Sequence, residues 1–228
     1  MYAREFNGKT YNFGVVGVDT GTLILYDEET GSRWNQLFGE AISGPMAGHK
    51  LQKYDSTLTT WDQWRREHPD TTVYIKRSIP YNVRFDQAAF AAIAEMADGP
   101  IRPNDLIVGL EGHINARAYL WRELAKDRLV QERFEKQPIL MFLSEDLTTA
   151  KAFVRTVAFI DLDFALNSED QLVDELTGSV WNPLSGKAES GPFSWFGLQL
   201  QPIVSTYAVW FAWHKYRPDT AVYPAGGD

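Results

Sequence analysis

Two stretches of the chain repeat one set of side chains that could bind a ligand. Each has an aspartate, a threonine, a serine and a tryptophan at the same spacing: Asp27, Thr30, Ser32 and Trp34, then Asp174, Thr177, Ser179 and Trp181. A carboxylate beside an indole could bind a cation or a sugar. The alternative is a hairpin turn that buries its tryptophan. We favour the turn, because small and aromatic positions recur together as they do in a packing unit, and keep these eight as candidate binding residues.

The repetition extends well beyond these residues. Residues 26–45 align with residues 173–192, and thirteen of the twenty positions are identical. After a two-residue insertion near Trp195, residues 51–74 align with residues 200–223, with eleven identities in twenty-four positions. Unrelated segments share far fewer. The sequence therefore predicts an internal duplication.

Each copy has the pattern of a small unit that combines strands with one short helix. In the first copy, β-rich runs over residues 10–17 and 22–27 predict two strands, and Gly31 can adopt the positive φ that the following turn needs. The capping-box spacing of Thr60 and Gln63 predicts a short helix that ends near His68. The second copy repeats this scheme, with its helix expected over residues 206–216.

The helix of each copy carries a pair of tryptophans: Trp61 and Trp64 in the first, Trp210 and Trp213 in the second. The spacing of three places both members of a pair on one helical face. A strand is predicted to follow each helix, over residues 71–75 and 220–223. We therefore expect both pairs to pack in the core rather than to form a stacking platform for a ligand.

The segment between the copies contains five further predicted elements. A helix is expected over residues 86–97, where apolar residues share one face. Residues 106–120 read as a strand pair that turns at Gly112, and a charged helix is expected over residues 121–134. The apolar run over residues 138–145 reads as a buried strand.

These elements predict an α+β, β-rich fold of two pseudo-repeated mixed α/β halves. We assign residues 1–80 to the first repeat, residues 81–104 to a helical connector and residues 105–228 to the second repeat. Met1 aligns with Thr148 of the second copy. The first half is therefore expected to be truncated at its N-terminus.

Composition limits the chemistry open to this chain. Its 228 residues are 44% hydrophobic and include no cysteine, which excludes disulfides, thiolate metal sites and cysteine nucleophiles. The net charge of −8 argues against binding to nucleic acid, and no apolar run is long enough to cross a membrane. The four histidines lack the spacing of a metal motif. We name no catalytic residue, no metal ligand and no cofactor.

The duplicated pattern D-x-x-T-G-S-x-W, followed by Gly-Pro, W-x-x-W and P-D-T, resembles the family catalogued as domain of unknown function 3179. The resemblance covers nearly the whole chain, and members of that family also tend to contain two related halves. Because relatives often carry an export signal or a lipid anchor, the resemblance implies an extracytoplasmic location. It implies no particular activity.

The resemblance also implies a polar constellation that this chain lacks. Relatives carry a His-Glu pair, an Asn-Asp pair and two cysteines, and other residues stand at those positions here: Asp127-Arg128, Gln131-Glu132, Ser144 and Leu147. If the constellation binds a metal or performs redox chemistry in relatives, the second copy has lost it. An intact version in the first copy would precede Met1.

We therefore expect a non-catalytic binding or structural module, an accessory subunit of a larger assembly. Another protein chain, or a segment before Met1, is expected to cover the truncated first repeat, because its missing strands would leave backbone edges unpaired. Two alternatives stay open. One is a metal-handling or redox enzyme whose reactive segment lies upstream, and the other is a carbohydrate-binding protein that uses exposed tryptophans.

Overall fold

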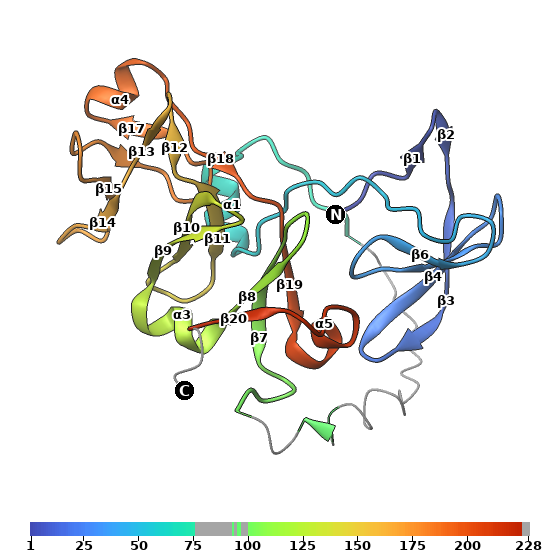
Figure 1. Ribbon diagram of the computed structural model, residues 1–228. Helices are drawn as coiled ribbons and strands as arrows, with labels where there is room; N and C mark the ends of the chain where they lie inside the picture. Colours follow the sequence, from blue (N-terminus) through green and yellow to red (C-terminus); the bar gives the residue numbers. More distant parts are fainter. Residues whose placement is uncertain (76–92, 94, 97–99, 225–228) are drawn as a thin grey trace.

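The computed structural model describes residues 1–75, 93, 95, 96 and 100–224 (Figure 1). Strands make up 41% of it and helices 13%, so the expectation of a β-rich chain with few helices is confirmed. The helix expected over residues 86–97 lies largely outside the described residues. The helices are short: α1 (Trp61–Glu67), α3 (Trp121–Asp127), α4 (Pro192–Trp195) and α5 (Trp210–Tyr216). No helix in the described part has the length and apolar character needed to cross a membrane.

Two four-stranded meanders lie on opposite sides of the molecule, one blue and one orange in Figure 1. The first contains β3 (Phe13–Asp19), β4 (Thr22–Asp27), β5 (Arg33–Asn35) and β6 (Glu40–Ser43). The second contains β14 (Phe164–Leu166), β15 (Leu172–Asp174), β16 (Val180–Trp181) and β17 (Ala188–Ser190). In both, the register shifts at the strand that carries the buried tryptophan, at Trp34 in one and Trp181 in the other. The two meanders share their strand order and antiparallel pairing, although the strands of the first are longer.

The largest core lies between two further sheets. One has the order β18-β11-β10-β9 and the other the order β19-β7-β8-β20. The first contains β9 (Leu129–Phe134), β10 (Gln137–Leu143), β11 (Ala150–Val154) and β18 (Gln201–Pro202). Strand β10 is apolar on both faces, as predicted for a buried strand, since Ile139 and Met141 enter one core cluster and Leu140 enters another. It therefore links this core to the second meander.

The sheet with the order β19-β7-β8-β20 is built around a hairpin. Its strands are β7 (Leu106–Glu111), β8 (Ala116–Leu120), β19 (Ser205–Val209) and β20 (Ala221–Tyr223). The outer strand β19 is antiparallel to β7, and the outer strand β20 is parallel to β8. The hairpin thus fills the space between two strands that precede and follow α5. Two small hairpins complete the fold: β1 (Glu5–Phe6) with β2 (Lys9–Thr10), and β12 (Thr156–Val157) with β13 (Ile160–Asp161).

Two predicted helices are too long. The stretch over residues 121–134 is helical only to Asp127, because Arg128 adopts a left-handed φ of 58° and β9 then pairs with β10. The helix expected over residues 206–216 begins only at Trp210, since the residues before it pair with β7 as β19. In both places, pairing with a distant strand overrides local helix propensity.

The strand predicted over residues 71–75 is wrong. Its counterpart in the second copy is β20, which pairs with β8. Residues 71–75 have no strand assignment and no strand among the described residues beside them. Since a strand is defined by its partner, the same local sequence gives a strand in one half only.

Candidate functional site

The first of the two candidate clusters is buried in its own meander. The carboxylate of Asp27 accepts hydrogen bonds from the Thr30 hydroxyl at 2.7 Å and from the Trp34 indole Nε1 at 2.7 Å. Asp27 and Ser32 are 0% exposed and Trp34 is 1% exposed. Burial by itself raises the pKa of Asp27, but the bonds from Trp34, Thr30 and Ser32 outweigh it and lower that pKa. The carboxylate is therefore held in its charged form by its own sheet.

The second cluster repeats this arrangement. The carboxylate of Asp174 accepts from the Thr177 backbone N–H at 2.7 Å, the Ser179 backbone N–H at 3.1 Å and the Trp181 Nε1 at 2.9 Å. Asp174 and Ser179 are 0% exposed and Trp181 is 1% exposed. Gly31 and Gly178 have φ values of 69° and 72°, so the positive φ predicted for Gly31 is confirmed.

Each cluster also fixes the Gly-Pro loop of its copy. The hydroxyl of Ser32 accepts from the backbone N–H of Met46, and that of Ser179 from the backbone N–H of Phe193, both at 3.0 Å. The two clusters lie in separate sheets on opposite sides of the molecule, so the eight candidate residues do not form one site (Figure 1). Their polar atoms serve the turns that they belong to. A ligand role for them stays a prediction.

Ion pairs and hydrogen bonds engage several of the residues at the positions where the resemblance implies a reactive constellation. Arg128 forms a bidentate pair with Asp170, with both N···O distances 2.6 Å. Glu132 pairs with Arg117 at 2.8 Å, and the hydroxyl of Ser144 donates to Asp146 at 2.6 Å. These polar groups are engaged inside the second half. Such contacts are typical of residues that stabilise a fold.

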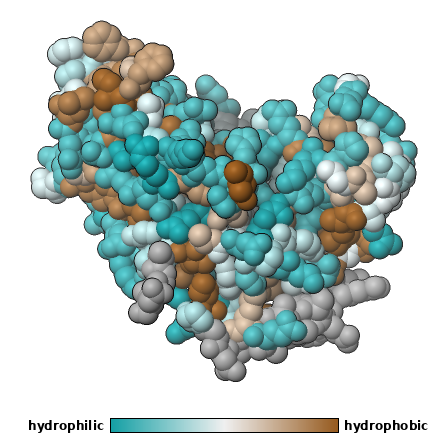
Figure 2. Space-filling view, in the orientation of Figure 1, coloured by the Kyte–Doolittle hydropathy of each residue, from teal (hydrophilic) through white to brown (hydrophobic). Residues whose placement is uncertain are grey.

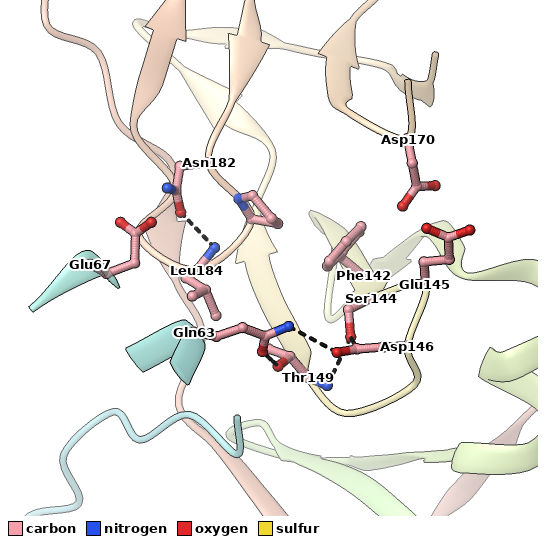
Figure 3. A pocket seen from close by; sticks show the side chains of 11 residues that line it. Gln63, Glu67, Phe142, Ser144, Glu145, Asp146, Thr149, Asp170, Asn182 and Leu184 are labelled. Atoms are coloured by element: carbon pink, nitrogen blue, oxygen red, sulfur yellow. Dashed lines mark hydrogen bonds between the residues drawn. The ribbon is translucent and has the colours of Figure 1, made fainter. Parts of the chain in front are cut away.

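A cavity of about 370 Å³ lies where α1 meets the second half (Figure 3). Gln63 projects from α1 toward the turn after β10, donating to Asp146 at 3.1 Å and accepting from Thr149 at 2.6 Å. Glu67 and Glu145 also line the cavity. Its carboxylates do not converge: in the part of the chain that the structure describes, no group of three or more His, Asp or Glu side chains could hold a metal ion. Polar contacts made by Gln63 attach α1 to the second half here.

A second cleft, of about 550 Å³, lies where α5 meets the first half. Arg217, just after α5, pairs with Glu40 on β6 and with Glu111 on β7, and its guanidinium lies 4.2 Å from the centre of the Phe38 ring. Burial opposes the charge on Glu40, but hydrogen bonds from Lys50 and Arg217 lower its pKa. Arg217 therefore connects the first meander to the sheet around β7.

Arg217→Ala is expected to lower the free energy of unfolding by about 2 kcal/mol, because Glu40 and Glu111 would lose their shared cation in a half-buried place. Arg133→Ala is the matched control, since that arginine is 60% exposed in its pair with Asp161; it should cost less than about 1 kcal/mol. Urea unfolding of both variants measures the difference. Equal losses would show that Arg217 does not connect the two parts.

The tryptophan pairs of the two helices lie in different surroundings. Trp210 and Trp213 are 6% and 0% exposed, so their predicted core packing is confirmed. Trp61 is 46% exposed, and α1 has no buried residue. The core packing predicted for the first pair is therefore wrong for Trp61. The reason is the hairpin β7–β8, which contributes Ile107, Ala118 and Leu120 to the cluster around Trp213 and has no counterpart over α1 among the described residues.

The residues after α1 are exposed as well. Val73, Tyr74 and Ile75 are 59%, 87% and 78% exposed. Sequence reasoning placed them in a strand and missed them as a surface. The alignment contained the signal. In the second copy the corresponding strand β20 pairs with β8, and the residues of β8 have no aligned counterpart in the first copy.

A separate group of exposed apolar residues lies at the far end of the second meander. Trp195 and Phe196, near the two-residue insertion of the second copy, are 81% and 75% exposed, and Phe159 in the turn between β12 and β13 is fully exposed. Figure 2 shows hydrophobic colour at this end of the molecule. The described residues give no sign of what would contact it.

The fold and these contacts define a β-rich protein with two similarly built meanders and, in its first half, a helix α1 that has no buried residue. The model of the family described as protein of unknown function (DUF3179) matches residues 1–220. The chain therefore belongs to this family, and the resemblance inferred from the sequence is confirmed. No curated protein and no solved structure matches the chain significantly.

Proposed function

We propose that this chain is a non-catalytic module that binds another protein through one face of its first half, as a subunit of a larger assembly. This face, called the open face below, consists of the side of α1 that carries Trp61, together with residues 73–75. One comparison carries the proposal. The open face exposes Trp61 and Tyr74, whereas the corresponding Trp210 and Tyr223 of the second half pack against residues of β7 and β8.

The physical reason is the cost of leaving this surface in water. Burying one large apolar side chain contributes about 1.5–3 kcal/mol, and large exposed apolar patches mark interaction sites. Residues 73–75 belong to no strand among the described residues, and an unpaired extended segment is a template for another strand. A protein partner can satisfy both requirements at once.

We also propose that the two halves arose by duplication, with the first repeat at residues 1–80, a connector at 81–104 and the second repeat at 105–228. The matching Asp-Thr-Ser-Trp networks and the matching register shifts support this. Under this proposal the duplicated turn is a packing unit, and the two halves differ in what covers their helix.

The proposal is tested by site-specific photocrosslinking in cells that express the full chain. A photoreactive phenylalanine analogue at Tyr74 should crosslink to one defined polypeptide, and Val73→Ser with Ile75→Ser should abolish that product. The control position is Leu176, which is 61% exposed in the second half. The same products from positions 74 and 176, or products that survive both serine substitutions, would contradict the proposal.

A further inference from the structure

We infer that the partner supplies a two-stranded β-hairpin, which inserts between residues 56–60 and residues 72–75. This inference rests on the proposed function and names the chemistry of the partner at the open face. Its basis is the second half, where the hairpin β7–β8 lies between β19 and β20. In the alignment, β19 and β20 correspond to residues 56–60 and 72–74.

The two halves present these segments in the same way. Helices α1 and α5 have bounds that coincide in the alignment, position for position. In the first half, the indole of Trp64 donates to the Thr71 hydroxyl at 3.1 Å; in the second, the indole of Trp213 donates to the Thr220 hydroxyl at 2.8 Å. The turn that directs β20 away from α5 is therefore already formed after α1.

The turn itself repeats down to its backbone bonds. The N–H of His68 donates to the Trp64 carbonyl at 2.9 Å, and that of Thr71 donates to the His68 carbonyl at 3.1 Å. Arg217 and Thr220 donate to the corresponding carbonyls at 3.0 and 3.3 Å. The turn after α1 therefore directs residues 72–75 in the way that the turn after α5 directs β20.

Among the described residues, no hairpin lies between these two segments of the first half. Residues 71–75 belong to no strand. Residues 56–60 form one isolated backbone bridge, between Leu58 and Ala150, and the hydroxyls of Thr57 and Thr59 accept hydrogen bonds from Lys151 and Thr149. Leu58 is 43% exposed and Trp61 is 46% exposed. In the second half the hairpin between the outer strands exchanges backbone hydrogen bonds with both of them. Addition of strands to an exposed segment is a common mode of peptide recognition.

The second half also specifies what the hairpin must carry. One strand must run parallel to residues 72–75 and the other antiparallel to residues 56–60. The strand under the helix needs a glycine at the tryptophan, because a Cβ on Gly109 would lie 2.3 Å from the Trp213 ring. Trp64 occupies the equivalent place in α1, so the same requirement holds for the partner.

The chain's own hairpin sequence provides a probe. A synthetic peptide of residues 105–120 contains no tryptophan, so a change in tryptophan fluorescence on binding comes from the eight tryptophans of the full chain, which include Trp61 and Trp64. We expect saturable binding with a blue-shifted emission, and slowed amide exchange at residues 72–75. The matched control is the same peptide with Gly109→Leu, which should bind at least tenfold more weakly because the added side chain meets the indole.

The outcomes separate this inference from the proposed function. Tight binding of the first peptide, weak binding of the second and protection of residues 72–75 support the hairpin. Equal binding of both peptides, or protection elsewhere in the chain, overturns it. If the peptide does not bind while crosslinking at Tyr74 persists, the chain binds a protein there in another way, and only the hairpin inference fails. Loss of the crosslink with retained peptide binding would overturn the proposed function instead.

Discussion

Asp174→Ala is expected to lower the free energy of unfolding by about 3–5 kcal/mol, and Asp27→Ala by a similar amount. Each carboxylate is fully buried and accepts from an indole, a threonine and neighbouring backbone. Alanine would leave those buried donors without acceptors, and each orphaned group costs about 1–3 kcal/mol. Denaturant unfolding monitored by circular dichroism measures both losses.

The neighbouring residues Glu28 and Glu175 give matched controls in the same two turns. Both are exposed, so replacing either by alanine should change stability by no more than about 0.5 kcal/mol. If the aspartate variants were as stable as these controls, the duplicated phrase would not be a packing unit. Its buried polar groups would then need another explanation, such as a ligand.

The Asp27 network also makes stability depend on pH. The pKa of Asp27 is lowered in the folded chain, so its contribution is fully present above the ordinary value of 3.8 and is lost as the pH falls through the depressed folded value. Wild-type protein should therefore lose stability below about pH 4. Asp27→Asn should remove that part of the acid dependence.

Trp213→Ala is expected to cost about 3–5 kcal/mol, whereas Trp64→Ala should cost about 1 kcal/mol. The two residues are equivalent in the alignment, and both indoles donate to a threonine hydroxyl. Trp213 is 0% exposed and packs on Gly109 and Phe38. Trp64 is half-buried on a helix that has no buried residue, so less contact is lost.

This pair of variants provides its own control, because helix propensity and hydrogen bonding change alike in both. Chemical unfolding at one temperature gives the two free energies. Similar losses of stability at both positions would mean that α1 is covered to the same extent as α5. The difference between the halves would then be smaller than their exposed areas indicate.

Much of the fold could be predicted from particular residues. The alternating β runs gave the strands of the meanders, and the spacing of Thr60 and Gln63 gave α1, whose first turn is capped by a bond from the Gln63 N–H to the Thr60 hydroxyl at 3.2 Å. The buried strand β10 followed from an unbroken apolar run. The local pattern was sufficient in these cases because each element is specified by residues that lie close together in the sequence.

The errors share one physical cause. Leu129–Phe134 and Ser205–Val209 became strands, and residues 71–75 did not, because strand formation depends on a partner far away in the sequence. The exposed face of α1 could not be predicted from its tryptophan spacing for the same reason. The pattern that buries Trp213 in one half exposes Trp61 in the other, and only the tertiary arrangement decides between them.

Amide hydrogen exchange of the purified full chain tests the open face most directly. The measurement compares residues 73–75 with Val222 and Tyr223, their counterparts in β20. We expect the amides of residues 73–75 to exchange at nearly the rate of an unfolded chain, and those of β20 to be protected by pairing with β8. Equal protection of the two segments would contradict the account, because residues 73–75 would then already be paired as β20 is.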